Sequence, residues 1–196
     1  MDETPYHLHQ PAVPGEEQYR SLALVNTRFT LSHGPVDLLE DADAARLWLV
    51  RRELLPDRTA LAGRQHGRLL ALRESARALF AARAAAGAPP PTALDALNAA
   101  LAAAPPTPHL LWDTPAGGPR RADRPDHGNP VGAALSLLAE DTADLLTGPE
   151  AEQLAECAAQ GCDRWFLRSH AARRWCCTKC GNRVRAARAY AARKTR

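Results

Sequence analysis

The chain has 196 residues and a formal net charge of +3 at pH 7, and 45% of its residues are hydrophobic. No run of about eighteen apolar residues occurs, so the sequence predicts no membrane-spanning helix. The polar start carries no basic-then-apolar signal pattern, and we expect a cytoplasmic location. Aromatic residues make up only 5% of the chain, whereas alanine is abundant. This composition favours closely packed helices over a large sheet and predicts a mainly α fold.

The first 150 residues are predicted to contain two regions. Residues 1–18 are rich in proline and are expected to be mobile. Residues 19–150 are expected to form a helical domain with a small β element. Near its start, the segment 21–27 is predicted to hold a short strand or helix and ends in Asn26 and Thr27. They either cap a turn or line a ligand pocket, and the sequence leaves both interpretations open.

The remaining elements of this domain follow from apolar periodicity and from the residues that start and stop helices. Asp41 is a good N-cap residue, and Thr92 with Asp95 resembles a capping box. Most arginines of the longest helix are expected to be solvated or paired with acids. An arginine of this helix that faced inward could hold an anionic ligand, and the sequence does not say which one. We expect a strand and turn at 28–35, helices at 41–54, 59–86 and 92–104, a strand at 109–112, a hairpin turn or mobile loop at 113–129, and helices at 130–146 and 149–154.

All five cysteines lie near the C-terminal end, in two close groups separated by thirteen residues. Four thiols in two short-loop pairs can surround one zinc ion, and four protein ligands leave no open position for a substrate. An odd cysteine count and no sign of secretion argue against a disulfide framework. The sequence therefore predicts a structural zinc site.

Spacing alone does not choose all four ligands. The second pair is either Cys176-x3-Cys180 or Cys177-x2-Cys180, and the latter spacing is the commoner one in zinc sites. His170 is a further ligand by residue type. Residues 163–167 and 173–176 are predicted to be two short strands of this module. The module is expected to span residues 151–196.

The charge of the chain is unevenly distributed. Residues 157–196 hold 11 basic residues and one acid, whereas residues 1–156 hold 14 basic residues and 21 acids. A helix rich in alanine and arginine is predicted from Asn182 onward. Such asymmetry favours a polyanion partner, since arginine matches phosphate geometry. The predicted nucleic-acid contacts are Arg173, Arg174, Lys179, Arg183, Arg185 and Arg188.

The strings Arg173-Arg174-Trp175-Cys176 and Cys180-Gly181-Asn182-Arg183 resemble the signature of the CGNR zinc-finger family of bacterial proteins. In that family the zinc cysteine directly follows the aromatic residue, which implies Cys176 rather than Cys177. The resemblance thus implies a Zn²⁺ ion bound by four thiolates and a module that binds DNA. The implied zinc ligands are Cys157, Cys162, Cys176 and Cys180.

Members of this family usually carry a helical N-terminal domain, the ABATE domain, which is thought to sense a ligand in stress-induced transcription regulators. The segment Val25-Asn26-Thr27 resembles a segment near the start of that domain. The resemblance implies that a small-molecule ligand binds the helical domain. A homodimer, in which the ligand changes the spacing of two tails, is a further hypothesis.

Two functions compete. The first is a DNA-binding transcription regulator, in which the zinc ion stabilises a module too small to fold on its own core. The second is a protein-interaction module whose basic tail docks on an acidic partner. An enzyme is not expected, because the sequence contains no phosphate-binding loop, nucleophile elbow or paired acid and base.

Overall fold

The structure is a computed structural model that describes residues 12–31, 34–113, 117–124, 126 and 128–194. These residues form a mainly α fold, as predicted, with three two-stranded antiparallel sheets. The α-helices are α1 (Arg20–Val25), α2 (Ala42–Arg51), α3 (Gly63–Ala84), α4 (Pro91–Ala103), α5 (Pro130–Thr147) and α6 (Thr178–Lys194). The strands are β1 (Arg28–Leu31), β2 (Gly34–Asp37), β3 (Thr107–Asp113), β4 (Gly118–Arg124), β5 (Leu154–Glu156) and β6 (Trp165–Leu167), and one 3-10 helix, η2 (Pro149–Gln153), precedes β5.

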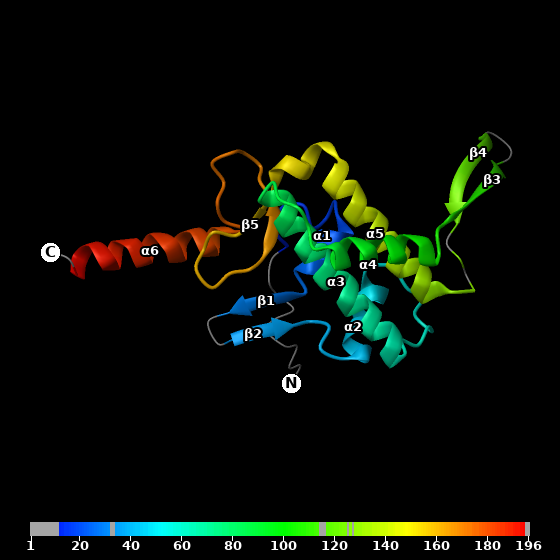
Figure 1. The fold of residues 1–196 in the computed structure, drawn as a ribbon, viewed down its shortest axis with the longest axis horizontal. Helices are drawn as coiled ribbons and strands as arrows, with labels where there is room; N and C mark the ends of the chain where they lie inside the picture. The colour runs from blue at the N-terminus through cyan, green and yellow to red at the C-terminus, as the bar shows by residue number, and fades with distance from the viewer. Residues whose placement is uncertain (1–11, 32–33, 114–116, 125, 127, 195–196) are drawn as a thin grey trace.

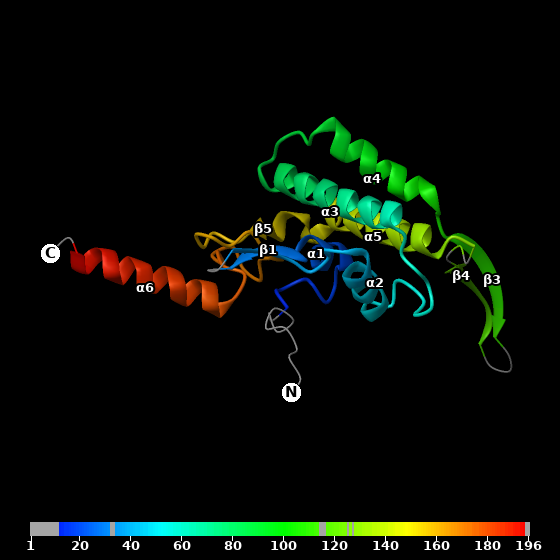
Figure 2. The ribbon, with the colours of Figure 1, turned by 90° about the horizontal axis from the view of Figure 1, so that it is seen from below.

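Three long helices form the body of the protein, and each of α3, α4 and α5 packs against the other two (Figure 2). Their contact faces carry leucine and alanine, so the helices approach closely, as the composition predicts. Leu69, Leu135 and Leu138 are almost completely buried in this core. This core holds the helices of the body together.

Local signals predicted the helix ends unevenly. Asp41 caps α2 as expected, since its carboxylate accepts a hydrogen bond from the amide of Ala44 at 2.8 Å. Thr92 is not a cap: α4 begins at Pro91 and Thr92 lies inside its first turn. Proline is well suited to the first helical position, because its missing N–H would have no partner there.

The zinc module differs from the prediction in its strands. Residues 173–176 do not form a strand, and β6 pairs instead with β5, in the register Leu154↔Leu167. The last helix also starts earlier than predicted, at Thr178. Cys180 therefore lies in the first turns of α6, so the helix itself holds one of the clustered thiols.

The helical domain and the zinc module share one hydrophobic core. Leu22 of α1 and Phe80 of α3 pack in the same cluster as Leu154 and Trp165 of the β5–β6 sheet. The rings of Phe80 and Trp165 lie 5.9 Å apart between centroids. This shared core fixes the zinc module against the helices.

An N-terminal strap, residues 12–19, lies across the junction. Residues 1–11 of the segment predicted to be mobile lie outside the described residues, but Val13 and Glu16 are buried. Gly15 has φ +97°, and a Cβ there would lie 2.7 Å from Cγ of Leu167. Only glycine combines this backbone conformation with such a close approach. The amide of Leu167 donates to the carbonyl of Pro14 at 2.8 Å, which ties the strap to β6.

The molecule is elongated, with a projection at each end (Figure 1). Helix α6 extends from the zinc module at one end. The β3–β4 hairpin extends from the body at the other end, and both views show it clear of the helices (Figures 1 and 2).

Candidate metal centre and nucleic-acid interface

Four thiols meet at the base of α6. The sulfur atoms of Cys157, Cys162, Cys176 and Cys180 all lie within 4.8 Å of one another. The Sγ atoms of Cys162 and Cys176 are 3.8 Å apart, and those of Cys176 and Cys180 are 3.7 Å apart. A tetrahedron with Zn–S bonds of about 2.3 Å has edges of about 3.8 Å. The donor set therefore fits Zn²⁺ in both chemistry and size.

Backbone hydrogen bonds hold the first cysteine pair in place. The amide of Cys157 donates to the carbonyl of Arg164 at 2.9 Å, and the amide of Cys162 donates to the carbonyl of Ala159 at 3.0 Å. Between the two cysteines, Gly161 adopts φ +70°. This left-handed conformation turns the chain so that Cys162 returns toward Cys157.

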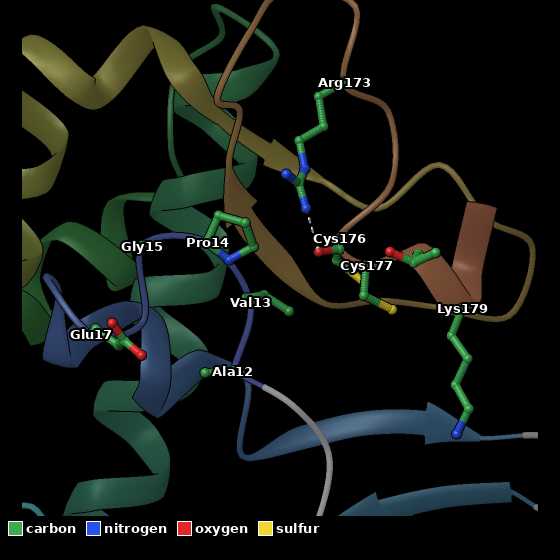
Figure 3. Close-up of a pocket in the computed structure, with 10 residues that line it drawn as sticks. Ala12, Val13, Pro14, Gly15, Glu17, Arg173, Cys176, Cys177 and Lys179 are labelled. Carbon is green, nitrogen blue, oxygen red and sulfur yellow. Dashed lines mark hydrogen bonds between the residues drawn. The ribbon is translucent and has the colours of Figure 1, made fainter. Parts of the chain in front are cut away.

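The structure distinguishes the two adjacent cysteines. Cys176 is 1% exposed and belongs to the thiol cluster, whereas Cys177 is half-buried and lies outside that cluster. Both residues also border a neighbouring groove of about 590 Å³ (Figure 3). His170 is exposed and is likewise not a member of the cluster.

Two arginines pack around the second cysteine pair. The guanidinium of Arg173 donates to the carbonyl of Trp175 at 3.1 Å. It also donates to the carbonyl of Cys176 at 3.0 Å (Figure 3). It also stacks over the ring of Phe166, 5.7 Å from its centroid. The guanidinium of Arg185 lies 5.8 Å from the centroid of the Trp175 ring.

The crowded thiols strongly perturb one another's protonation. Hydrogen bonds with Cys162 and Cys176 lower the pKa of the Cys157 thiol to about 2. Burial and the nearby Cys162 and Cys157 sulfurs raise the pKa of Cys180 to about 12. Hydrogen bonds with Cys157 also raise the pKa of the Cys162 and Cys176 thiols, so without a metal the cluster retains several protons at neutral pH. Zinc binding releases these protons, since each ligand must be a thiolate, and zinc affinity falls as the pH falls.

Asn26 joins the helical domain to the zinc module. It is 5% exposed, and its side chain pairs with the backbone of Trp165. Nδ2 donates to the Trp165 carbonyl at 2.8 Å, and Oδ1 accepts from the Trp165 amide at 2.8 Å. Nδ2 also donates to Oε1 of Glu16 at 2.6 Å. The side chain thus acts as an extra strand residue beside β6.

Two further ion pairs cross the same junction. Glu16 of the strap accepts from Arg164 at 3.1 Å, and both side chains are over 90% buried. Arg77 of α3 pairs with the Asp163 carboxylate at 3.7 Å and also donates to the carbonyls of Val25 and Asp163 at 2.8 and 3.0 Å. The Asp163 carboxylate in turn accepts from the amide of Thr30 at 2.9 Å. The sequence patterns did not single out Glu16 or Arg77, because their charged partners Arg164 and Asp163 lie 148 and 86 residues away.

The inward-facing arginine of α3 is Arg73, which is 3% exposed. Its guanidinium binds both carboxylate oxygens of Asp37, at 2.6 and 2.7 Å, and donates to Oγ1 of Thr27 at 3.1 Å. Burial opposes ionisation of Asp37, but the hydrogen bonds from Arg73 and from the amide of Leu39 hold its pKa below the ordinary value. The Arg73 charge is therefore neutralised within the chain.

Most of the predicted nucleic-acid contacts are accessible. Arg174, Lys179, Arg183, Arg185 and Arg188 are exposed, whereas Arg173 is half-buried against Phe166. Helix α6 carries six basic residues and no acid. Because it projects from the body, both its sides are open along most of its length (Figures 1 and 2).

These features define a helical domain joined to a C-terminal zinc finger. Residues 20–149 match the ABATE family, described as "Putative stress-induced transcription regulator", and residues 153–194 match the CGNR zinc finger. The first match covers most of the chain, which therefore belongs to the ABATE family and ends in a CGNR zinc finger with a Zn²⁺ site. A comparison with curated proteins found no match.

The family matches agree with the resemblance in the order of the two parts. Neither family description names an enzymatic activity. No helix of the described residues is both long and apolar enough to cross a membrane.

Proposed function

We propose that this protein is a cytoplasmic transcription regulator that binds DNA through α6 and the adjoining zinc loops. One observation carries the proposal: helix α6, which has six basic residues and no acid, projects from the cysteine cluster of the zinc module. Neutralising several phosphates along such a helix releases counterions and drives association. The family description as a transcription regulator supports the same function.

The dimensions of α6 suit duplex DNA. Its 17 residues span about 25 Å at about 1.5 Å per residue. A B-DNA major groove, about 12 Å wide, admits an α-helix. Exposed basic residues on several sides of α6, such as Arg183 and Arg188, then reach phosphates on either strand.

The aromatic residues favour duplex DNA over single-stranded RNA. RNA readers stack unpaired bases on exposed aromatic rings. In the described part of the zinc module, Trp165 and Phe166 are buried in the core and Trp175 lies beneath Arg185. Tyr190 is 71% exposed, but one exposed ring cannot stack several bases.

The helical domain is the part that we propose senses a ligand or stress signal. Its coupling to α6 would run through the shared core and the Asn26–Trp165 pair. We propose Asn26 and Thr27 as ligand contacts, and their burial restricts how a ligand could reach them. Both side chains are buried and hydrogen-bonded within the chain. A ligand there must displace those bonds and would thereby loosen the zinc module.

The second candidate is docking of α6 on an acidic protein partner. Docking on the helical domain of the same chain is disfavoured, because α6 points away from it (Figure 1). Salt dependence and preference for duplex over other polyanions separate the two candidates.

The test is fluorescence anisotropy of a labelled duplex, titrated with zinc-loaded protein at several salt concentrations. The variant Arg183→Ala/Arg188→Ala is compared with Arg64→Ala/Arg68→Ala, which removes two exposed charges from α3. We expect the α6 variant to reduce the slope of log K against log[salt] by about 2, at about 0.9 per phosphate contact.

The α3 variant should bind like the wild type. Equal binding by both variants, or stronger binding to an acidic polypeptide or heparin than to duplex DNA, would contradict the proposal. In the latter case the docking function becomes the better explanation.

A further inference from the structure

The β3–β4 hairpin carries an apolar surface that the proposed function does not use. Leu110 and Trp112 of β3 are 72% and 68% exposed, the latter a large ring in open solvent. Among the described elements, β3 and β4 pack substantially only against each other. Isolated two-stranded hairpins are marginal in water, so a partner that covered this arm would stabilise it.

Strand register places the apolar residues together. Side chains of alternate residues share one face of a strand, and directly paired residues share a face across strands. Leu110 pairs with Arg121, and Trp112 pairs with Pro119. One face, here called the arm face, therefore consists of Pro108, Leu110, Trp112, Pro119, Arg121 and Asp123.

The charges on the arm face are self-complementary. It carries one cation, Arg121, and one anion, Asp123, two residues apart on β4 and both exposed. A two-fold axis lying between two stacked arm faces, perpendicular to the strands, reverses the strand direction but keeps β4 over β4. Centred between these two residues, it sets each Arg121 against the Asp123 of the other copy. Leu110 then covers Pro108 of the other copy, and Trp112 reaches the base of its arm.

We propose that the arm face docks on the arm face of a second copy, forming a two-fold dimer. This partner satisfies both the apolar and the charged groups of the arm face, as an isologous interface requires. Helix α6 lies at the opposite end of the molecule (Figure 1). The dimer therefore leaves both basic helices uncovered, one at each end of the assembly.

The small arm face predicts a weak dimer, because specific interfaces below about 1,200 Å² are generally transient. Sedimentation velocity of the full zinc-loaded chain is therefore followed from about 1 to 300 μM, the range expected for such an affinity. We expect the wild type to shift from monomer to dimer across this range. Trp112→Ala should weaken dimerisation at least about 30-fold, since buried aromatic anchors dominate interfaces.

A matched control removes an exposed apolar residue elsewhere. Leu94 on α4 is 44% exposed, and Leu94→Ala should dimerise like the wild type. A wild-type chain that remains monomeric at the highest concentration overturns the proposal, and a different partner must then cover the arm. A Trp112→Ala variant that dimerises normally also overturns it.

Charge reversal tests whether the partner is a second copy. Arg121→Glu and Asp123→Arg should each weaken self-association, because like charges then face each other. Mixing the two variants should restore dimers, as heterodimers, and so should the double variant R121E/D123R. Failure of both rescues, with each variant folded by circular dichroism, overturns the two-fold packing.

Discussion

Replacing Asn26 by alanine provides a direct test of the junction between the helical domain and the zinc module. The substitution removes the hydrogen-bond partners of the Trp165 amide and carbonyl. Both residues are buried, since Asn26 is 5% exposed and Trp165 is 3% exposed. Each buried polar group that loses its partner costs about 1–3 kcal/mol. We therefore expect Asn26→Ala to lower the free energy of unfolding by about 2–6 kcal/mol.

Urea denaturation of the zinc-loaded protein, followed by Trp fluorescence, measures this change in ligand-free protein. Glu17→Ala serves as the control, because Glu17 is exposed in the same strap. It should change stability by less than about 0.5 kcal/mol. A loss below about 1 kcal/mol in Asn26→Ala would refute the structural role. It would instead favour the alternative that Asn26 mainly serves a ligand.

Three further changes test other parts of the structure. Cys176→Ser should lose stoichiometric zinc by metal analysis while Cys177→Ser retains it, and equal retention would contradict the assignment of the cluster. Asp37→Asn should destabilise the protein by about 2 kcal/mol at pH 7, because it leaves the buried Arg73 guanidinium with only the more exposed Glu74 carboxylate as a charged partner. Since the folded pKa of Asp37 lies below its ordinary value of 3.8, the carboxylate stabilises the fold above that value. The difference between the variant and the wild type, measured by urea denaturation, should shrink as the pH falls further; a constant difference would refute this. Gly15→Ala should lower the melting temperature, since its Cβ would collide with Leu167 at a positive φ, and an unchanged melting temperature would count against the packing of the strap.

The sequence was sufficient to predict those features that depend on neighbouring residues. Cysteine spacing indicated the zinc site, proline and glycine indicated most helix ends, and the resemblance favoured Cys176 over Cys177. The geometry shows why spacing alone could not make that choice. Adjacent side chains point in different directions, and the path of the chain after Trp175 decides which sulfur turns inward.

The sequence was insufficient to predict contacts between residues that lie far apart along the chain. Strands β5 and β6 have three residues each, too few to show an alternating pattern, so the pairing of β6 was predicted wrongly. Strand β4 reads GPRRADR and has no apolar alternation, so the sequence predicts a turn or loop there and not a strand. Asn26 meets Trp165 across 139 residues, a contact that no local pattern encodes.

Hydrogen exchange of the full zinc-loaded protein, with and without a duplex, tests the central claim most directly. If α6 and the zinc loops bind DNA, new protection should concentrate in residues 168–194 and leave β3–β4 and α4 unchanged. A matched measurement with Cys180→Ser, which removes one sulfur from the cluster, should show no such protection. Protection that appears mainly on the helical domain, or none at duplex concentrations well above those needed in the anisotropy titration, would contradict the account.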